Sequence, residues 1–297
     1  MNSLRDNRQY ILPSGLAVAI AGVLASPILY AQEANITELD AIEVSADAAE
    51  PSGTAPSDGY TAEATVTGTK TTTSVVETPQ SISTVTADQI EDQNAANLGE
   101  VLHYTAGARG ETFGFEPRTT FLRIRGFDVA TSGLFRDNLK LANPGFAAGY
   151  SLEPYGAERI DVLKGPSSVL YGQAGPGGLV NYVSKRPTFD TRREVRVEAG
   201  TNDLVQGHFN ISGAVNDSDT LAVRLVGLVR DSETQVDFVN DDRKYLAPSL
   251  TWQPTDATRL TVLAHWQYDD TQPSQRYPLQ GTLEPNPNGP IPDNRFT

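Results

Sequence analysis

The residues that could carry out chemistry in this chain are few and widely spaced. The three histidines, His103, His208 and His265, form no HExxH run and no paired ligand set, so a built-in transition-metal site is not expected. Cysteine is absent, which excludes thiol nucleophiles, disulfides and cysteine-ligated zinc or iron–sulfur centres. These residue types therefore indicate neither a metal cofactor nor thiol catalysis.

A glycine cluster that follows Ser167 and Ser168 invites two further readings, a phosphate cradle and a nucleophilic serine. The dinucleotide fingerprint GxGxxG fails because Val180 stands where the third glycine should be, and no Walker lysine follows Gly172. The serines lack the GxSxG elbow of serine hydrolases. The sequence therefore predicts no enzymatic activity.

Charge and length narrow the class further. The 297 residues suffice for about two structural units. Lys and Arg number 23 against 37 Asp and Glu, and this net charge of −14 has the wrong sign for neutralising nucleic-acid phosphates. Residues 32–69 hold eight acidic side chains and no Lys or Arg. The charge distribution thus divides the chain into segments.

The first segment, residues 1–31, has the layout of a secretory signal, with a positive start and an apolar stretch bounded by Ala31. Residues 16–25 are the clean apolar part, and they are about half as long as the ~20 residues that a membrane-spanning helix needs. Cleavage after Ala31 is therefore favoured over a retained anchor. The sequence predicts export across the inner membrane.

The acidic segment 32–69 is predicted to be a flexible arm, because it is rich in small and polar residues. Residues 40–46 within it alternate apolar and polar side chains, which suits an extended segment that adds itself to the edge of a partner's sheet. The competing interpretation is a run without function in a disordered tail. The segment consists of Asp40, Ala41, Ile42, Glu43, Val44, Ser45 and Ala46.

Residues 70–191 have the pattern of an α+β domain. A capping box at Thr86 predicts one short helix, and Asn97 with Glu100 predicts another that ends at Gly107. Gly165-Pro166 should end a strand and begin a third short helix that Gly172 terminates. The predicted strands are 81–85, 121–125, 134–136 paired through a two-residue turn with 139–141, 160–164 and 179–184.

From Glu194 onward the chain alternates strictly between apolar and polar residues. The alternation predicts five antiparallel strands, whose lengths approach the ~9–11 residues that cross a bilayer at a tilt. Trp252, Trp266 and Tyr268 fall near strand ends, as interfacial aromatics do in outer-membrane barrels. A soluble β-sandwich also alternates and is the competing interpretation. The predicted strands are 194–199, 205–215, 221–230, 245–253 and 259–268, with tight turns at 216–219 and 255–258 and a long loop at 232–243.

Five strands cannot close a barrel without leaving an unpaired edge in hydrocarbon. We therefore expect these 297 residues to be the first part of a longer polypeptide.

Five motifs resemble the plug domain of TonB-dependent ferric-siderophore receptors. They are ETPQSISTVT at 77–86, LRIRGF at 122–127, RIDVLKGPSSVLYG at 159–172, GPGG at 175–178 and NYVSKRP at 181–187. The resemblance covers residues 70–191 as the plug and residues 192–297 as the opening strands of a barrel that in this family has roughly 22 strands. Its signature positions are Arg123, Arg125, Gly126, Arg159, Gly165, Pro166, Tyr171, Gly172, Gly177 and Gly178.

The resemblance implies an outer-membrane receptor of a Gram-negative bacterium that binds a ferric siderophore outside the cell and passes it to the periplasm. Residues 40–46 then resemble a TonB box, and TonB is the implied partner. No resident cofactor is implied, and the chelate remains open between hydroxamate, catecholate, mixed and non-iron types. The competing hypothesis is a secreted β-rich adhesion or ligand-binding module without transport.

Two expectations about side chains follow from the resemblance. Arg123, Arg125, Arg159 and Lys164 should form ion pairs with barrel carboxylates. Loops at the outer end of the plug should contact the chelate, because arginine donates hydrogen bonds to its oxygens and aromatic rings stack on its planar groups. The predicted ligand residues are Arg109, Phe113, Phe115, Glu116, Arg118, Phe146 and Tyr150.

Overall fold

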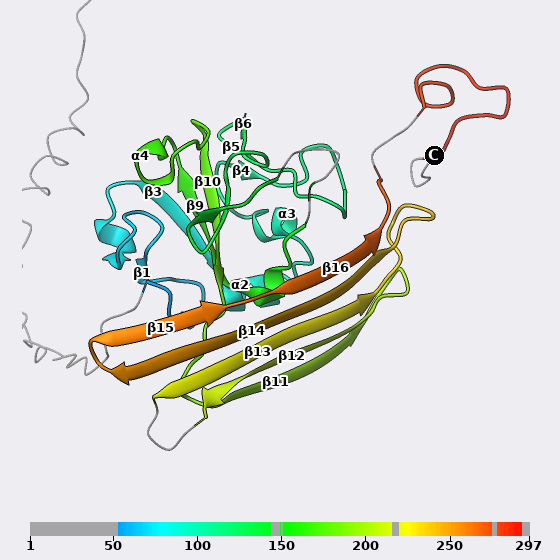
Figure 1. The fold of residues 1–297 in the computed structure, drawn as a ribbon. Coiled ribbons are helices and arrows are strands. Elements are labelled where there is room, and N and C mark those ends of the chain that lie inside the picture. The colour runs from blue at the N-terminus through cyan, green and yellow to red at the C-terminus, as the bar shows by residue number, and fades with distance from the viewer. Residues whose placement is uncertain (1–52, 144–148, 150, 216–219, 275–277, 293–297) are drawn as a thin grey trace, which may run out of the picture. The chain divides into compact units, whose positions relative to one another are not determined.

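The computed structural model describes residues 53–143, 149, 151–215, 220–274 and 278–292. Segments 1–31 and 40–46, together with Phe146 and Tyr150, lie outside the described residues. The described chain builds a globular α+β domain, residues 53–191, and a sheet of long strands, residues 192–271 (Figure 1).

The core of the globular domain is a mixed five-stranded sheet. Its strands lie in the spatial order β3 (Ser81–Thr86), β9 (Ala157–Lys164), β10 (Gly178–Ser184), β7 (Leu134–Arg136) and β8 (Leu139–Lys140). All pairs are antiparallel except β10 with β7. The two central strands β9 and β10 are almost entirely buried, so their residues form much of the hydrophobic core.

Two predicted helix starts are confirmed. In α2 (Ala87–Asp92) the Thr86 hydroxyl accepts a hydrogen bond from the Gln89 amide, and in α3 (Leu98–Val101) the Asn97 side chain accepts one from the Glu100 amide. The predicted end of α3 at Gly107 is wrong. The helix stops at Leu102, and Gly107, at φ 76°, turns the chain into β4 (Ala108–Arg109).

The turns between short strands follow from backbone conformation. Asp137 and Asn138 both have positive φ, as the predicted two-residue hairpin between β7 and β8 requires. The strand predicted at 121–125 shrinks to β5 (Arg123–Ile124), because Arg125 and Gly126 also adopt positive φ and reverse the chain into β6 (Phe127–Asp128). The remaining short elements are β1 (Ala64–Thr65), β2 (Thr73–Ser74), η1 (Val75–Glu77) and η2 (Pro154–Gly156).

The third predicted helix is α4 (Ser168–Tyr171), and it begins later than expected. The sequence predicts Pro166 at its first position, but the helix starts after Ser167. Gly165 donates its backbone N–H to the Gly177 carbonyl, which keeps this part of the chain alongside the β9–β10 pair rather than in the helix. Gly172 ends α4 with positive φ, as predicted.

The long-stranded sheet is antiparallel throughout. Its strands are β11 (Arg192–Ala199), β12 (Val205–Ala214), β13 (Leu221–Asp231), β14 (Asp241–Thr255), β15 (Thr258–Leu263) and β16 (Trp266–Thr271). Two predictions need correction. β14 begins at Asp241 instead of residue 245, which shortens the predicted 232–243 loop, and the predicted strand 259–268 is divided into β15 and β16, both paired with β14.

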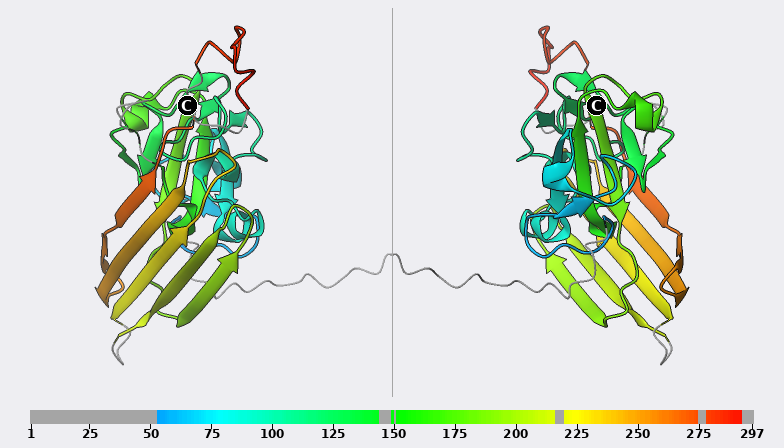
Figure 2. Two further views of the ribbon diagram at one scale, coloured as in Figure 1. Left: turned by 90° about the vertical axis from the view of Figure 1, so that its right-hand side faces the viewer. Right: turned by 90° about the vertical axis from the view of Figure 1, so that its left-hand side faces the viewer.

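The two faces of this sheet are inverted relative to a water-soluble sheet. Both side views show the globular domain against one face (Figure 2). That face is polar and buried: Asn210, Ser212 and Arg224 are 6%, 3% and 2% exposed. The opposite face is apolar and exposed, with Val195 at 77% and Val262 at 53%. A soluble sandwich would bury the apolar face, so this arrangement contradicts the sandwich and fits a wall facing lipid.

Neighbouring side chains complete the apolar face. The Phe209 ring lies over Gly227, where an added Cβ would be 2.3 Å from the ring, so this glycine makes room for the aromatic side chain. Trp252 and Trp266 are exposed on the same face. Among the described residues, no helix is long and apolar enough to cross a membrane.

A charged substitution on the apolar face tests its exposure to lipid. Leu225 lies at the middle of β13, and Leu225→Arg in the full-length protein should lower the free energy of unfolding in phospholipid vesicles by about 2–4 kcal/mol. Val205→Arg, at the end of β12, should cost only about 0–1 kcal/mol because the end of a strand lies near the interface. Urea titration in vesicles measures both, and equal small effects would contradict a lipid-facing wall.

Candidate functional site

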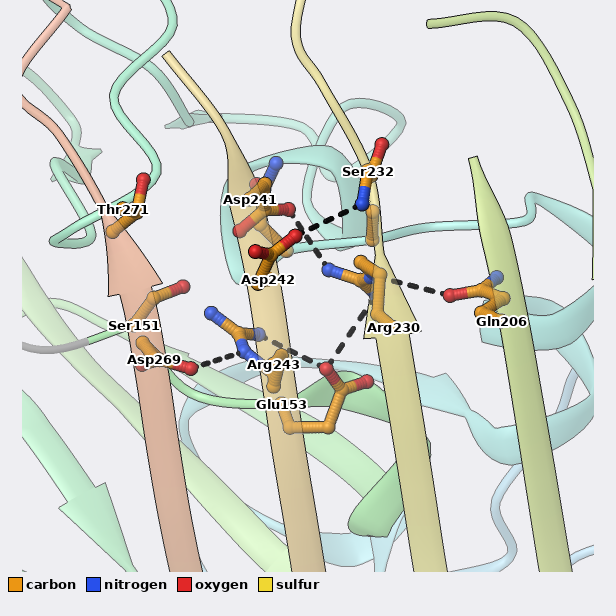
Figure 3. Close-up of polar contacts among 12 residues, drawn as sticks. Ser151, Glu153, Gln206, Arg230, Ser232, Asp241, Asp242, Arg243, Asp269 and Thr271 are labelled. Carbon is orange, nitrogen blue, oxygen red and sulfur yellow. Dashed lines mark hydrogen bonds and ion pairs between the residues drawn. The ribbon is translucent and has the colours of Figure 1, made fainter. Parts of the chain in front are cut away.

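The polar interface between the globular domain and the sheet is centred on Glu153. This residue caps η2 and accepts a hydrogen bond from the Tyr155 amide. Its carboxylate also accepts one from Arg243 Nη1 at 2.9 Å and lies 3.6 Å from Arg230 Nη2 (Figure 3). Glu153, Arg230 and Arg243 are at most 5% exposed, so the two strands β13 and β14 hold the domain through one buried carboxylate.

Each arginine of this cluster has a second acidic partner on the sheet. Arg230 Nη1 lies 3.0 Å from Asp241, and Arg243 Nε lies 2.6 Å from Asp269. Arg230 Nε also donates to the Gln206 side chain at 3.0 Å (Figure 3). We call Glu153, Arg230, Arg243, Asp241 and Asp269 the Glu153 network. Because its charges are paired and hydrogen-bonded, the network can remain ionised although buried.

The guanidinium groups determine the protonation of Glu153. Burial alone would raise the pKa of this carboxyl, but Arg230 and Arg243 outweigh that effect and hold the pKa below its usual value. A carboxyl whose pKa falls on folding stabilises the folded state above its unfolded pKa, and that stabilisation is lost as pH falls through the folded pKa. Docking of the domain should therefore weaken in acid.

A second ion pair joins the domain to the sheet between Arg224 of β13 and Glu158 of β9, at 3.1 Å. The Arg224 guanidinium also donates to Asn210 Oδ1 at 2.9 Å and to the Arg186 carbonyl at 2.9 Å. Arg224 is 2% exposed, and its interactions span β12, β13 and the segment after β10. The sheet thus contributes arginines and the domain contributes carboxylates.

Close packing accompanies these charges at Gly156. A Cβ at this position would lie 2.0 Å from the Tyr245 hydroxyl and 2.6 Å from that of Tyr182. Tyr245 accepts a hydrogen bond from Arg136, and Tyr182 donates one to the Glu153 carbonyl. Any side chain at 156 would separate η2 from β14.

The expected ion pairs from the domain's own cations are not found among the described residues. Arg159 lies 3.6 Å from Asp161 on its own strand, and its Nε and Nη2 have no hydrogen-bond partner in the described chain. Lys164 donates to Ser83. Arg123 lies over the Phe113 ring, and neither Arg123 nor Arg125 pairs with a described carboxylate. The described strands supply arginines at the interface, so the charge pattern is the reverse of the prediction.

Other signature residues shape the turns around β9 and β10. A Cβ on Gly177 would be 2.4 Å from the Ile124 carbonyl oxygen, and one on Gly178 would be 2.1 Å from that of Leu163. Tyr171 donates to the Thr67 carbonyl at 2.9 Å and carries the Lys70 ammonium over its ring at 3.4 Å. These residues hold the domain together and contact no described strand of the long sheet.

The structure divides the predicted ligand residues into two groups. Arg118 makes two hydrogen bonds, at 2.8 and 3.1 Å, to the buried Glu116 carboxylate, so these two charges satisfy each other. Arg109 is exposed and pairs across β4–β5 with Arg123, while Phe113 is 60% exposed beside it. Phe115 lines a cavity between the domain and the sheet. Phe146, Tyr150 and segment 40–46 lie outside the described residues.

Sequence reasoning assigns Arg224 and Arg230 to the polar face but misses their partners. Glu153 and Glu158 lie in no periodic pattern, and Arg243 falls in a predicted loop. The short interval between Pro154 and the β9 motif is the only sequence sign that this segment is buried. Within the described residues, no group of His, Asp and Glu is arranged to hold a metal ion.

Comparisons with known proteins agree on the architecture. Residues 74–179 match the family model of the TonB-dependent Receptor Plug Domain. The chain is 38% identical over 283 residues to the ferrichrome outer membrane transporter/phage receptor of Escherichia coli (strain K12), covering 92% of this chain and 37% of that protein. It is 38% identical over 258 residues to the ferrioxamine receptor of Yersinia enterocolitica, covering 86% and 36%.

A solved structure shares the fold. The ferripyoverdine receptor of the outer membrane of Pseudomonas aeruginosa, bound to ferripyoverdine, superposes with a TM-score of 0.66 at 26% identity, covering 72% of this chain and 29% of that one. The chain therefore spans a little over a third of the length of the curated relatives named above.

Removing the charge of Glu153 tests the Glu153 network. Glu153→Gln should lower the free energy of unfolding by about 3 kcal/mol, because two buried guanidinium groups lose a shared carboxylate. Glu77→Gln makes the same chemical change at an exposed position and should stay within about 0.5 kcal/mol. Wild-type stability should fall below about pH 4.3, and the Glu153→Gln variant should show a flatter profile. Indistinguishable acid profiles in urea titrations would contradict this role.

Proposed function

Because this chain belongs to the TonB-dependent receptors, the family whose plug domain its residues 74–179 match, we propose that the full-length protein takes up a ferric siderophore. The globular domain is the plug and the long-stranded sheet is part of the barrel wall, and the relatives are outer-membrane proteins of Gram-negative bacteria. The receptor binds the chelate at the cell surface and releases it to the periplasm without making or breaking a covalent bond.

The observation that carries this proposal is the inverted sheet with the plug attached to its polar face. An apolar outer face needs lipid, and a buried polar inner face needs polar groups opposite it. Glu153 and Glu158 provide them. A secreted adhesion module would have no use for an apolar outer face, so transport accounts for the sheet and the competing hypothesis does not.

Transport requires the plug to change, because a packed domain in the lumen blocks a ligand of this size. Residues 40–46 are the proposed contact for TonB, which would pair with them by strand addition. The family resemblance implies that TonB delivers work from the inner-membrane proton gradient. Strand addition uses backbone hydrogen bonds, so it depends on the N–H groups of this segment rather than on particular side chains.

The proposed ligand is a hydroxamate chelate of ferric iron. Two of the relatives described above are named for ferrichrome and ferrioxamine, which are hydroxamates. Arg109 and Phe113 are exposed and are the described residues best suited to contact it, with Phe146 and Tyr150 as further candidates. Arg118 is withdrawn from this role because Glu116 occupies its guanidinium group.

A proline in the arm should separate binding from transport. Ile42→Pro or Val44→Pro removes a backbone donor needed for strand addition, so uptake of radioactive ferric chelate should stop while binding to whole cells is unchanged. Ala49→Pro lies in the same arm outside the segment and should leave uptake intact. Normal uptake by the Ile42→Pro variant, or loss of binding together with uptake, would refute this division of roles.

Growth of a deletion strain carrying the full-length gene tests the substrate. Ferrichrome or ferrioxamine B should support growth on iron-limited medium, and the empty strain should not grow on the same chelate. Uptake of isotopically labelled iron provides a second measurement. Growth on no ferric chelate in the panel would contradict the proposed function.

A further inference from the structure

A cavity of about 420 Å³ lies between the plug and the wall, apart from the exposed residues proposed to meet the chelate first. It is bounded by α2 and η2 on the plug and by β11, β12 and β13 on the wall. At one end it reaches Thr201 and Gln235, in the loops that follow β11 and β13, and elsewhere it reaches Lys185 and His208. Cavities of this volume accommodate much of a small-molecule ligand.

His208 faces this cavity with unused hydrogen-bonding capacity. Its side chain is 8% exposed, and neither ring nitrogen has a hydrogen-bond partner among the described residues. The nearest charged atom, Glu198 Oε1, is 3.5 Å from Nε2. A buried polar group without a partner needs an explanation, and a bound molecule or water in the cavity supplies one.

Aromatic and cationic groups surround the histidine. Tyr155 packs edge-to-face against it with ring centroids 4.8 Å apart, and the Lys185 ammonium lies 4.3 Å from the centre of the tyrosine ring. The Tyr155 hydroxyl has no hydrogen-bond partner in the described chain. Burial, then the nearby Arg224, lower the pKa of Lys185 to about 8. These side chains offer hydrogen-bond donors and ring faces to a ligand rich in oxygen atoms.

The charge of the cavity lining is strongly unequal. Seven carboxylate residues line it, against three cationic ones, Lys185, Arg196 and Arg230. Arg196 is already shared by Glu91 of α2 and by Glu194 and Glu198 of the wall. Because a low-dielectric cavity strengthens repulsion between like charges, this lining disfavours a multiply charged anion.

We propose that this cavity is an inner binding site in which a neutral or cationic hydroxamate chelate is held between α2 and the wall on its way past the plug. This inference rests on the proposed uptake function and adds a location and a charge preference to it. Ferrichrome is neutral and ferrioxamine B carries one positive charge, so both are compatible with the lining. A ferric tris-catecholate carries three negative charges and is excluded.

Thiol labelling tests the site, because these 297 residues contain no cysteine. His208→Cys in the full-length receptor, with any cysteine outside these residues changed to serine, is modified with aminoethyl or sulfonatoethyl methanethiosulfonate. Ile211→Cys, on the outward face of the same strand and 46% exposed, is the matched control. Binding and uptake of labelled ferrioxamine B and ferrichrome are then measured on whole cells.

Modification at 208 should reduce uptake of both chelates at least tenfold and leave surface binding unchanged, whereas modification at 211 should change neither. For ferrioxamine B, the cationic adduct should inhibit more than the anionic adduct. Should His208→Cys fail to assemble, Gln235→Cys, an exposed residue that also lines the cavity, replaces it.

Normal uptake after complete modification at 208 or 235 would overturn the inner site while leaving the proposed function intact. Equal inhibition of ferrioxamine B by both adducts, or wild-type uptake of a ferric tris-catecholate, would overturn its charge preference. Failure of the unmodified wild-type receptor to take up any ferric chelate would instead refute the proposed function, and the inner site with it.

Discussion

A sheet that buries its polar face must find charged and hydrogen-bonding partners there, and this constraint governs the rest of the structure. Arg224, Arg230 and Arg243 lie on the inner face, and each would be costly to bury alone. Glu153 and Glu158 of the plug meet them, supported by Asp241 and Asp269. Plug and wall are therefore complementary by necessity, because the inner face of this wall is not satisfied without the plug.

The same principle operates inside the plug, where one buried carboxylate gathers the segment that follows the arm. The Asp161 side chain on β9 accepts hydrogen bonds from Thr65 at 2.7 Å, Thr67 at 2.5 Å and Thr84 at 2.9 Å. The chain near β1 is thereby joined to the central strand, while Glu153 and Glu158 join the other end of the same region to the wall. The route from the arm to the wall thus runs through a few buried acidic side chains.

Local signals in the sequence predicted much of this architecture. Thr86 and Asn97 cap helices as expected, and the alternation in β13 assigned Arg224 and Arg230 to the polar face. What failed depended on tertiary contacts. β14 extends back to Asp241 because Arg243 must reach Glu153, although the acidic start of this strand reads as a loop. Likewise, nothing near Arg118 in sequence shows that its charge is used by Glu116 within a buried pair rather than by a ligand.

The most direct test of the account is a labelling scan along β13 in lipid. Single fluorophores placed at successive positions from 221 to 231 of the full-length receptor, in vesicles containing brominated phospholipid, report which side chains touch acyl chains. We predict strong quenching at odd-numbered positions such as 223 and 225 and weak quenching at even-numbered ones such as 224 and 226, following the alternation of exposure along the strand. Quenching without this period, or strongest at the even-numbered positions, would contradict a wall whose apolar face meets lipid and whose polar face meets the plug.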